Sequence, residues 1–577
     1  MEKEHVAMLS EAVTNPALEM FTNALQCLVV PEKMLETHFQ IFHHFIESMG
    51  KKMTNEKFQE GLKKFLFEVF ERNQDIKSQS FSSIREFKSK LSALSKMNWD
   101  REERKIVENV DLLYNQINRV SKRKVSSLEL HNMCNWLADY KWCGEKDFIE
   151  VPGQYSGDSK PFVEQHVKIV RFEHKLKVFA SKQLPIEIRI QGSDGKTYNY
   201  IIKYGEDLRQ DQRIQQSLEL MSKQLAMDKN CKQNHLKIQT YQVIPINENC
   251  GLISVVQNAT TITDYLQEST QYFLETSFFD FLPTVKEQFR NFLLNGTAFR
   301  TWGKTYENAV MGRSRDELAE ELATKEAMFP KDIIRRALMN SAISLETYYI
   351  LRKNFITSLA TMSIAHWLLG IGDRHLSNIL IEVQSGRLIG IDFGIAFGAA
   401  ANLLVPEIVP FRLTSHFVNV IEPMGVEGVI KKNMIHVLRC LRNHSATILI
   451  CLEMFVKEPT MDWLVRSKMK SVGNVEGEVS LASSDWNPEA RIEIVRRKLE
   501  GANPVTIIKD ELSISQIASK EALLERYKSL AEGDDTCVRK NMKEHSLTPE
   551  EQVACLTEMA TDKALLATIY LGWDPWI

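Results

Sequence analysis

Residues 370–378 read Gly-Ile-Gly-Asp-Arg-His-Leu-Ser-Asn, and residues 390–394 read Gly-Ile-Asp-Phe-Gly. Asp373 and Asn378 have the Asp-x-x-x-x-Asn spacing of kinase catalytic loops, and Asp392 opens an Asp-Phe-Gly triplet that supplies a second carboxylate. Phosphoryl transfer needs magnesium across the phosphates and a carboxylate near the attacking hydroxyl. The two motifs therefore predict the metal-and-base centre of a phosphotransferase.

The segment between the two motifs predicts a β-hairpin. Residues 379–383 and 387–391 are rich in β-branched and apolar side chains, and Ser385-Gly386 lies between them as a tight turn. A hairpin of this length returns the chain so that Asn378 and Asp392 face one another and can share a magnesium ion, which prefers oxygen ligands. The alternative is that each residue only caps a turn. Two correctly spaced matches joined by a hairpin favour the metal centre.

A nucleotide-phosphate site is predicted upstream. Residues 186–191 and 197–203 form the arms of a second hairpin around a glycine-rich turn, and Lys203 ends its apolar second arm. A charge-rich segment then opens a helix that continues to about Met227. A strand-end lysine facing carboxylates at a helix start is the ion pair that holds the α- and β-phosphates in kinases. Glu206 and Asp211 are both possible partners, and the sequence does not choose between them.

A turn before this hairpin is placed to cover the phosphates. It follows a predicted strand at residues 177–180 and spans residues 181–185, Ser-Lys-Gln-Leu-Pro. We expect Ser181, the backbone amides of the turn and Lys182 to contact the phosphates.

The motifs resemble one superfamily. The triplet at 373–375 is Asp-Arg-His, the reverse of the His-Arg-Asp of ordinary protein kinases. Together with Gly205-Glu-Asp-Leu-Arg-Gln-Asp-Gln-Arg213 and Pro410-Phe-Arg-Leu-Thr414, it resembles the phosphatidylinositol 3-kinase-related protein kinases. Within that family, residues 497–504 resemble the DNA-dependent branch, and residues 571–577 resemble the C-terminal FATC segment. The likeness covers roughly residues 148–577.

The resemblance implies an α+β fold: a two-lobed protein-kinase-like (PI3/PI4-kinase) domain preceded by an α-helical segment and ended by a short helical FATC segment. The implied order is a helical, FAT-like segment at 1–150, a kinase N-lobe at 151–257, a kinase C-lobe at 258–504, a linker of mixed helix at 505–544 and the FATC-like segment at 545–577.

The resemblance also implies roles for individual residues. Asp373 is the catalytic base and His375 a second catalytic contact, while Asn378 and Asp392 bind magnesium. The nucleotide is ATP, with Mg²⁺ as the cation and Mn²⁺ as an alternative. The implied nucleotide contacts are Lys203 on phosphate, Tyr241 and Asp211 in the adenine pocket, Leu380 and Ile391 beneath the base, and the hinge Ser254, Val255 and Val256.

Composition limits the compartments and the partners. The nine cysteines include no Cys-x-x-Cys pair, which indicates a reducing compartment and argues against structural zinc. Met1 opens a charged stretch instead of a signal peptide, and the longest apolar stretch, residues 446–456, is too short to span a bilayer. We expect it to be a buried C-lobe helix and expect no membrane association. The net charge of −3 and the absence of a Lys/Arg stripe predict no direct DNA binding.

The two ends of the chain predict helices. Leu35, Phe39, Phe42, Ile46 and Met49 recur at helical spacing between Pro31 and Gly50, and Phe58, Leu62, Phe65 and Val69 repeat the pattern. A stripe of phenylalanines of this kind predicts the buried core of a helical segment. Near the C-terminus, Thr548-Pro-Glu-Glu551 predicts a capped helix start. We expect Trp573 and Trp576 to bury their rings against the C-lobe near the activation segment, which is residues 392–411.

Three function classes fit these motifs: a serine/threonine protein kinase, a phosphoinositide kinase and a catalytically weak scaffold. Residues 392–411 contain no lysine or arginine, and residues 399–405 are largely apolar. Phosphoinositide headgroups need basic residues and peptides do not, so the protein kinase is favoured. The resemblance implies nuclear kinase activity on Ser or Thr followed by Gln, in double-strand break repair by non-homologous end joining. It places contacts with the Ku heterodimer and DNA ends in regions outside these 577 residues.

Overall fold

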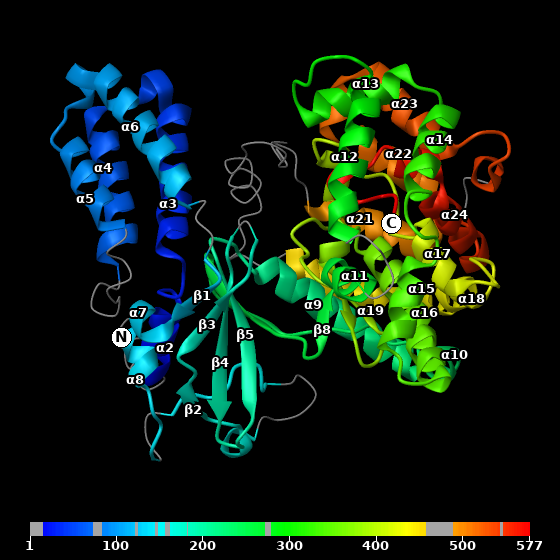
Figure 1. The fold of residues 1–577 in the computed structure, drawn as a ribbon, viewed down its shortest axis with the longest axis horizontal. Coiled ribbons are helices and arrows are strands. Elements are labelled where there is room, and N and C mark those ends of the chain that lie inside the picture. Colours follow the sequence, from blue (N-terminus) through cyan, green and yellow to red (C-terminus); the bar gives the residue numbers. More distant parts are fainter. Residues whose placement is uncertain are drawn as a thin grey trace. The chain divides into compact units, whose positions relative to one another are not determined.

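The computed structural model describes residues 15–72, 84–121, 125–144, 148–155, 162–181, 183–271, 278–456, 488–542 and 546–577. The chain divides into two compact units, drawn in Figure 1. Unit 1 comprises Met1–Gln212 with Tyr241–Val255, and unit 2 comprises Arg213–Thr240 with Val256–Ile577. Among the described residues, no helix combines the length and the apolar character needed to cross a membrane.

Unit 1 begins with helices. They are α2 (Pro16–Leu25), α3 (Pro31–Met49), α4 (Asn55–Leu66), α5 (Arg85–Leu94) and α6 (Trp99–Ser121), with the short turns η1 (Gly50–Lys52) and η2 (Phe67–Glu71). The predicted phenylalanine stripes are confirmed as core, because Phe39 and Phe42 of α3 pack against Phe58 and Phe65 of α4. Figure 1 shows α3 to α6 side by side.

An antiparallel sheet forms the rest of unit 1. Its path is β1-β3-β4-β5-β7-β6, and β2 also pairs with β4. The strands are β1 (Ser127–Glu129), β2 (Ile169–Phe172), β3 (Lys175–Val178), β4 (Ile186–Gly192), β5 (Thr197–Tyr204), β6 (Val243–Asn247) and β7 (Cys250–Ser254), with the short helices α7 (Leu130–Met133), α8 (Asn135–Asp139) and η4 (Val163–Gln165). One core joins α2, α7 and α8 to the sheet.

The predicted hairpin of residues 186–203 is confirmed. Strands β4 and β5 pair from Ile186↔Ile202 to Gln191↔Thr197. Strand β1 was not anticipated, because its three residues lie in a segment predicted to be helical. It pairs with β3, so part of the first 150 residues belongs to the sheet.

Unit 2 is mainly helical. Its first part is α9 (Arg209–Met227), which begins in unit 1, then α10 (Lys229–Gln233), β8 (Ala259–Thr261), α11 (Ile262–Thr270), α12 (Phe278–Leu294), α13 (Trp302–Gly312), α14 (Arg315–Glu326), α15 (Ile333–Ser341), α16 (Leu345–Leu368) and η5 (Leu376–Asn378). After η5 come β9 (Ile379–Glu382), β10 (Leu388–Gly390), η6 (Ala399–Asn402), α17 (Ser415–Ile421), α18 (Val429–Asn443) and α19 (Ser445–Val456). The C-terminal half of α16 is almost entirely buried, which makes it the central helix of this unit.

The second predicted hairpin is also confirmed. Strands β9 and β10 pair from Ile379↔Gly390 to Ile381↔Leu388, and β8 lies on the other side of β9. Residues 446–456 are helical within α19, as predicted, but the helix is not fully buried. Leu452 is fully buried, whereas Ile450 is 60% exposed and Met454 is 71% exposed.

The C-terminal part of unit 2 is helical. It comprises α21 (Pro488–Glu500), α22 (Pro504–Ser513), η7 (Gln516–Ser519), α23 (Glu521–Glu532), η8 (Val538–Asn541), α24 (Pro549–Thr561), α25 (Lys563–Leu566) and η9 (Leu571–Trp573). The predicted helix start is confirmed, because Thr548 and Glu551 form a reciprocal capping box at the start of α24. The chain ends inside this unit (Figure 1), and Trp576 is fully buried.

Candidate active site

The catalytic loop lies against the segment that follows Asp-Phe-Gly. The amides of Phe397 and Gly398 donate to the carbonyls of Leu369 (2.8 Å) and Gly370 (3.0 Å). Gly370 has a φ of +59°, and a Cβ there would lie 2.4 Å from the amide nitrogen of Gly398. A Cβ at Gly372 would lie 2.4 Å from the Cβ of Ala400. The glycines of the Gly-Ile-Gly-Asp motif thus permit close packing of the two segments.

This packing predicts the effect of adding one methyl group. Gly372→Ala should destabilise the protein by about 1–3 kcal/mol, because the new Cβ overlaps that of Ala400. Thermal unfolding measures the loss. The Gly372→Ala/Ala400→Gly double variant removes the opposing Cβ and should recover most of the stability. Equal instability of the single and double variants would contradict this cause.

Side chains hold both peptide groups of Asp373, whose φ is +57°. Its amide donates to Oε2 of Glu407 (2.9 Å), and its carbonyl accepts from Nδ2 of Asn378 (2.9 Å). Glu407 is 8% exposed. Burial raises the pKa of Glu407 to about 7, and the nearby negative charge of Asp373 acts in the same direction.

His375 faces the carboxylate of Asp373. Its Nε2 lies 4.0 Å from Oδ2 of Asp373, and its Nδ1 accepts from the amide of Ser377 (3.2 Å). Burial lowers the pKa of His375, and this outweighs the opposing effect of Asp373. The ring is therefore neutral at neutral pH, with Nε2 as the nitrogen that carries the proton and faces Asp373.

Arg374 ties the catalytic loop to the Asp-Phe-Gly segment. This buried guanidinium donates to the carbonyls of Gly372 (2.8 Å), Asn378 (3.3 Å), Ile391 (2.8 Å) and Asp392 (2.5 Å). Asp392, like Asp373, has a left-handed backbone, with a φ of +59°. Strained backbone of this kind persists only where its surroundings fix it. Here Arg374 fixes the peptide that follows Asp392.

The residues present fit a magnesium ion. Nδ2 of Asn378 is engaged by the Asp373 carbonyl, so Oδ1 is the atom that can bind a cation. The hairpin brings Asp392 beside Asn378, because the amide of Ile391 donates to the Asn378 carbonyl (3.0 Å). The described residues contain no cluster of three or more His, Cys, Asp or Glu with metal-binding geometry. Two oxygen ligands completed by phosphate oxygens and water suit Mg²⁺.

Leu380 and Ile391 share one face of the small sheet. Leu380 pairs with Ile389, and Ile391 lies two residues beyond Ile389 on the same side. Both side chains are half-buried. This arrangement is consistent with the predicted floor beneath a nucleotide base, and the assignment stays a prediction.

The predicted phosphate and adenine contacts of the N-lobe lie in unit 1. Nζ of Lys203 is 3.3 Å from Oε2 of Glu206, so Glu206, one of the two predicted partners, forms an ion pair with the lysine. Asp211 is 7% exposed in the first turn of α9, and Tyr241 is half-buried. Ser181 lies in an exposed turn after β3, where its amide donates to the Phe179 carbonyl (2.9 Å). Lys182 lies outside the described residues.

The predicted hinge follows β7. The amide of Val255 donates to the Asn199 carbonyl (2.9 Å), which extends the pairing with β5 by one bond. The boundary between the two compact units falls between Val255 and Val256. Val255 therefore continues the sheet of unit 1, whereas Val256 begins a segment of unit 2.

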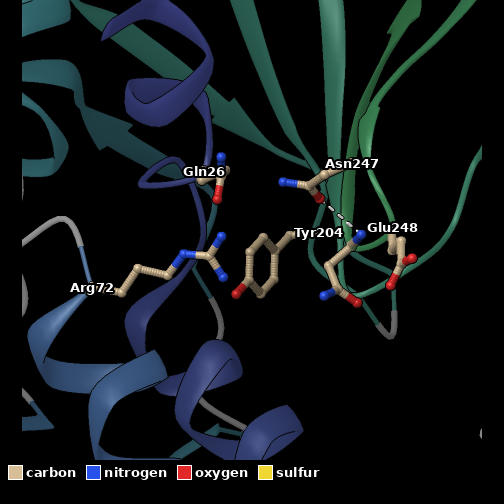
Figure 2. Close-up of a pocket in the computed structure, with 6 residues that line it drawn as sticks. Gln26, Arg72, Tyr204, Asn247 and Glu248 are labelled. Carbon is tan, nitrogen blue, oxygen red and sulfur yellow. Dashed lines mark hydrogen bonds between the residues drawn. The ribbon is translucent and has the colours of Figure 1, made fainter. Parts of the chain in front are cut away.

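A polar pocket of about 230 Å³ lies elsewhere in unit 1. It is lined by Gln26, Arg72, Tyr204, Asn247, Glu248 and Asn249 (Figure 2). The hydroxyl of Tyr204 also contacts Nε2 of His38 at 2.9 Å. Because neighbouring side chains of a strand point to opposite faces, the pocket and Lys203 lie on opposite faces of β5. The pocket is therefore not the predicted phosphate site.

The C-terminal tail reaches the catalytic loop through Arg412. Its guanidinium donates to the carbonyls of Trp573 and Ile577 and lies 3.8 Å from the ring centroid of Trp573. Its Nε donates to the Arg374 carbonyl (3.0 Å). Burial lowers the pKa of Arg412 to about 9, so the group stays charged at neutral pH. The predicted burial of both tail tryptophans is confirmed, since Trp573 is 3% and Trp576 is 0% exposed.

Sequence reasoning assigned no role to Arg374, Glu407 or Arg412. Arg374 and Arg412 lie inside the motifs quoted above, so the sequence pointed to their positions but did not predict their hydrogen bonds. Glu407 carried no signal of its own. Its link to Asp373 spans 34 positions and depends on the folded activation segment.

Comparison with known proteins agrees with this geometry. Residues 197–465 match the family described as phosphatidylinositol 3- and 4-kinase, and residues 546–577 match the FATC domain. The chain contains a phosphatidylinositol 3- and 4-kinase domain followed by a FATC domain. The family resemblance and the predicted fold class are thereby confirmed.

Two relatives are similar to this chain over most of its length. The chain is 37% identical over 446 residues to the DNA-dependent protein kinase catalytic subunit of Canis lupus familiaris, covering 77% of this chain and 11% of the relative. The protein of the same name from Dictyostelium discoideum is 30% identical over 597 residues, covering 100% of this chain and 14% of that relative. The chain thus spans about a tenth to a seventh of these relatives.

The solved structure is described as the complete CtTel1 dimer with C2 symmetry. It matches with a TM-score of 0.54 and 19% identity, covering 93% of this chain and 18% of that chain. At this identity the match supports the fold alone.

Proposed function

We propose that the chain is an ATP-dependent serine/threonine protein kinase of the DNA-damage-response type. The observation that carries the proposal is the centre formed by Asp373, Asn378 and Asp392, which Arg374 fixes through backbone carbonyls of the loop and the hairpin. The similarity to relatives named DNA-dependent protein kinase catalytic subunit supports the substrate class.

Each side chain has a defined task in this proposal. Asp373 accepts the proton of the attacking hydroxyl. The neutral ring of His375, whose Nε2 lies 4.0 Å from Oδ2 of Asp373, donates a hydrogen bond toward the charge on the phosphoryl group that is transferred. Asn378 and Asp392 hold magnesium, which neutralises phosphate charge when bound. Lys203, oriented by Glu206, contacts the phosphates.

The charge of the activation segment supports a peptide substrate, as its sequence suggested. Its apolar residues do not form a substrate surface, because Ala399, Ala400, Ala401 and Val405 are buried and only Leu404 is exposed, by 38%. The property that favours a peptide is the lack of positive charge in this segment. Without lysine or arginine between 392 and 411, the segment offers no cation to a phosphoinositide headgroup.

The finer assignments are part of the same proposal. The target is Ser or Thr followed by Gln, the compartment is the nucleus and the process is double-strand break repair by non-homologous end joining. The printed name of the relatives supports dependence on DNA. The net charge of −3 argues against DNA binding by these residues. Because the chain matches only 11% of the relative's length, we assign the contacts with DNA ends and with the Ku heterodimer to regions that correspond to the rest of the relative.

We expect the purified chain to phosphorylate a Ser-Gln peptide in preference to phosphatidylinositol vesicles. The assay offers both substrates together with radiolabelled ATP and Mg²⁺, and a Ser-Ala peptide of the same sequence serves as the matched control. Loss of labelling in Asp392→Asn excludes a contaminating kinase. Preferential labelling of lipid would assign the chain to the phosphoinositide kinases, and equal labelling of the two peptides would contradict the Ser-Gln preference.

A further inference from the structure

The backbone of Asp373 has a conformation that residues other than glycine seldom adopt. An aspartate at a φ of +57° is uncommon, and its amide and carbonyl are both held by distant side chains. The carbonyl is held by Asn378, which belongs to the same loop. The amide is held by Glu407, 34 positions away in the activation segment.

We propose that Glu407 is a positioning residue: by accepting the amide of Asp373 it holds that peptide in the left-handed conformation, which aims the Asp373 carboxylate at the substrate hydroxyl. The inference rests on the proposed kinase function and deepens it. Glu407 itself touches neither substrate nor nucleotide in this role and acts through Asp373 alone.

The surroundings of Glu407 suit a fixed acceptor. Its own amide donates to the Ala400 carbonyl (3.2 Å), and its neighbour Ile408 is fully buried, so the carboxyl group is anchored to the core of unit 2. The positive charges of Arg374 and Arg412 stabilise the ionised form of the Glu407 carboxyl group. These two arginines are themselves joined, because Nε of Arg412 donates to the Arg374 carbonyl. Glu407 thus links the activation segment to the catalytic loop at the peptide that precedes Asp373.

A buried carboxyl group is costly unless a donor compensates it. If Glu407 had only a structural role, any nearby donor could hydrogen-bond its carboxyl group. Here the donor is the amide of Asp373, the proposed catalytic base. The geometry therefore ties the orientation of Asp373 to the folded state of the activation segment.

The test compares three substitutions that differ in reach and in hydrogen-bonding ability. Glu407→Gln keeps an oxygen at the same distance, Glu407→Met keeps the size but has no strong acceptor, and Glu407→Asp keeps the charge but is one methylene shorter. We expect Gln to retain kcat within about twofold, and Met and Asp to lower kcat by about ten- to a hundredfold. KM for ATP and for peptide should stay within about threefold, because nucleotide contacts are untouched.

Glu326→Ala is the matched control. Glu326 is also a buried carboxylate of unit 2, but it contacts Ser415 (2.7 Å) and Lys563 (2.8 Å) instead of the catalytic loop. We expect this variant to lose thermal stability and to keep kcat. Equal kcat in Glu407→Met and the wild type, or a loss no larger than that of Glu326→Ala, would overturn the proposal.

A crystal structure of Glu407→Met separates this inference from the proposed function. If the wild type transfers no phosphate, the kinase assignment fails while the backbone claim can still be judged. We expect residue 373 to leave the left-handed region once the acceptor is removed. An unchanged φ at Asp373 would contradict the positioning role whatever the activity.

Discussion

Replacing Asp392 by asparagine is expected to lower phosphoryl transfer by about a thousandfold or more, with the fold retained. The substitution keeps the shape of the side chain but removes the charge that binds magnesium. The exposed carboxylate contributes little to packing, and the Asp392 carbonyl would still accept from Arg374. Radiolabel transfer to peptide measures the loss, and circular dichroism with thermal unfolding checks the fold.

The matched control for this prediction is Asp316→Asn, an exposed aspartate in the first turn of α14 that has no part in the site. It should leave transfer unchanged within about twofold. Wild-type turnover by Asp392→Asn would refute the assignment of this residue to the metal. Equal losses in the two variants would show that the chain is merely sensitive to lost negative charge.

Replacing Arg412 by methionine is expected to destabilise unit 2 severely and to remove activity. The change leaves the carbonyls of Arg374, Trp573 and Ile577 without this donor inside the core. Each buried unpaired carbonyl costs about 1–3 kcal/mol, and the sum is comparable with the 5–15 kcal/mol that stabilises a typical domain. Thermal unfolding and the yield of folded protein measure this effect.

Arg439→Met is the control for Arg412. Arg439 also reaches the C-terminal segment, through an ion pair with Glu550, but the side chains of that pair are 41% and 51% exposed. Exposed pairs contribute about 0–1 kcal/mol, so this variant should be nearly as stable and active as the wild type. A fully stable and active Arg412→Met would show that the hydrogen bonds from Arg412 to the tail and to the catalytic loop are not needed for the site.

Local signals in the sequence were sufficient for much of the fold. Both hairpins, the helix α3 between Pro31 and Gly50, and the capped start of α24 follow from patterns spanning a few residues, and the structure confirms them. The short strand β1 was missed because three residues carry no usable periodicity. The exposed face of α19 was missed because its sequence is apolar on nearly every side.

The candidate site was predictable where the motif itself carries the chemistry. Asp373, Asn378 and Asp392 could be proposed from spacing, whereas the ion pair between Lys203 and Glu206 is shown only by the structure. The contacts that Glu407 and Arg412 make with the catalytic loop could not have been predicted from local pattern. Their contacts with the loop span 34 and 38 positions, so only the folded activation segment brings them together.

The most direct test of the account is transfer of the γ-phosphate from ATP-Mg²⁺ to a Ser-Gln peptide by the purified chain, with the product sequenced by mass spectrometry. We predict one phosphate on the serine before glutamine, and none when the Asp392→Asn variant, prepared in the same way, replaces the wild type. Absence of any phosphopeptide from folded wild-type chain, or a phosphopeptide that persists in the Asp392→Asn variant, would contradict it.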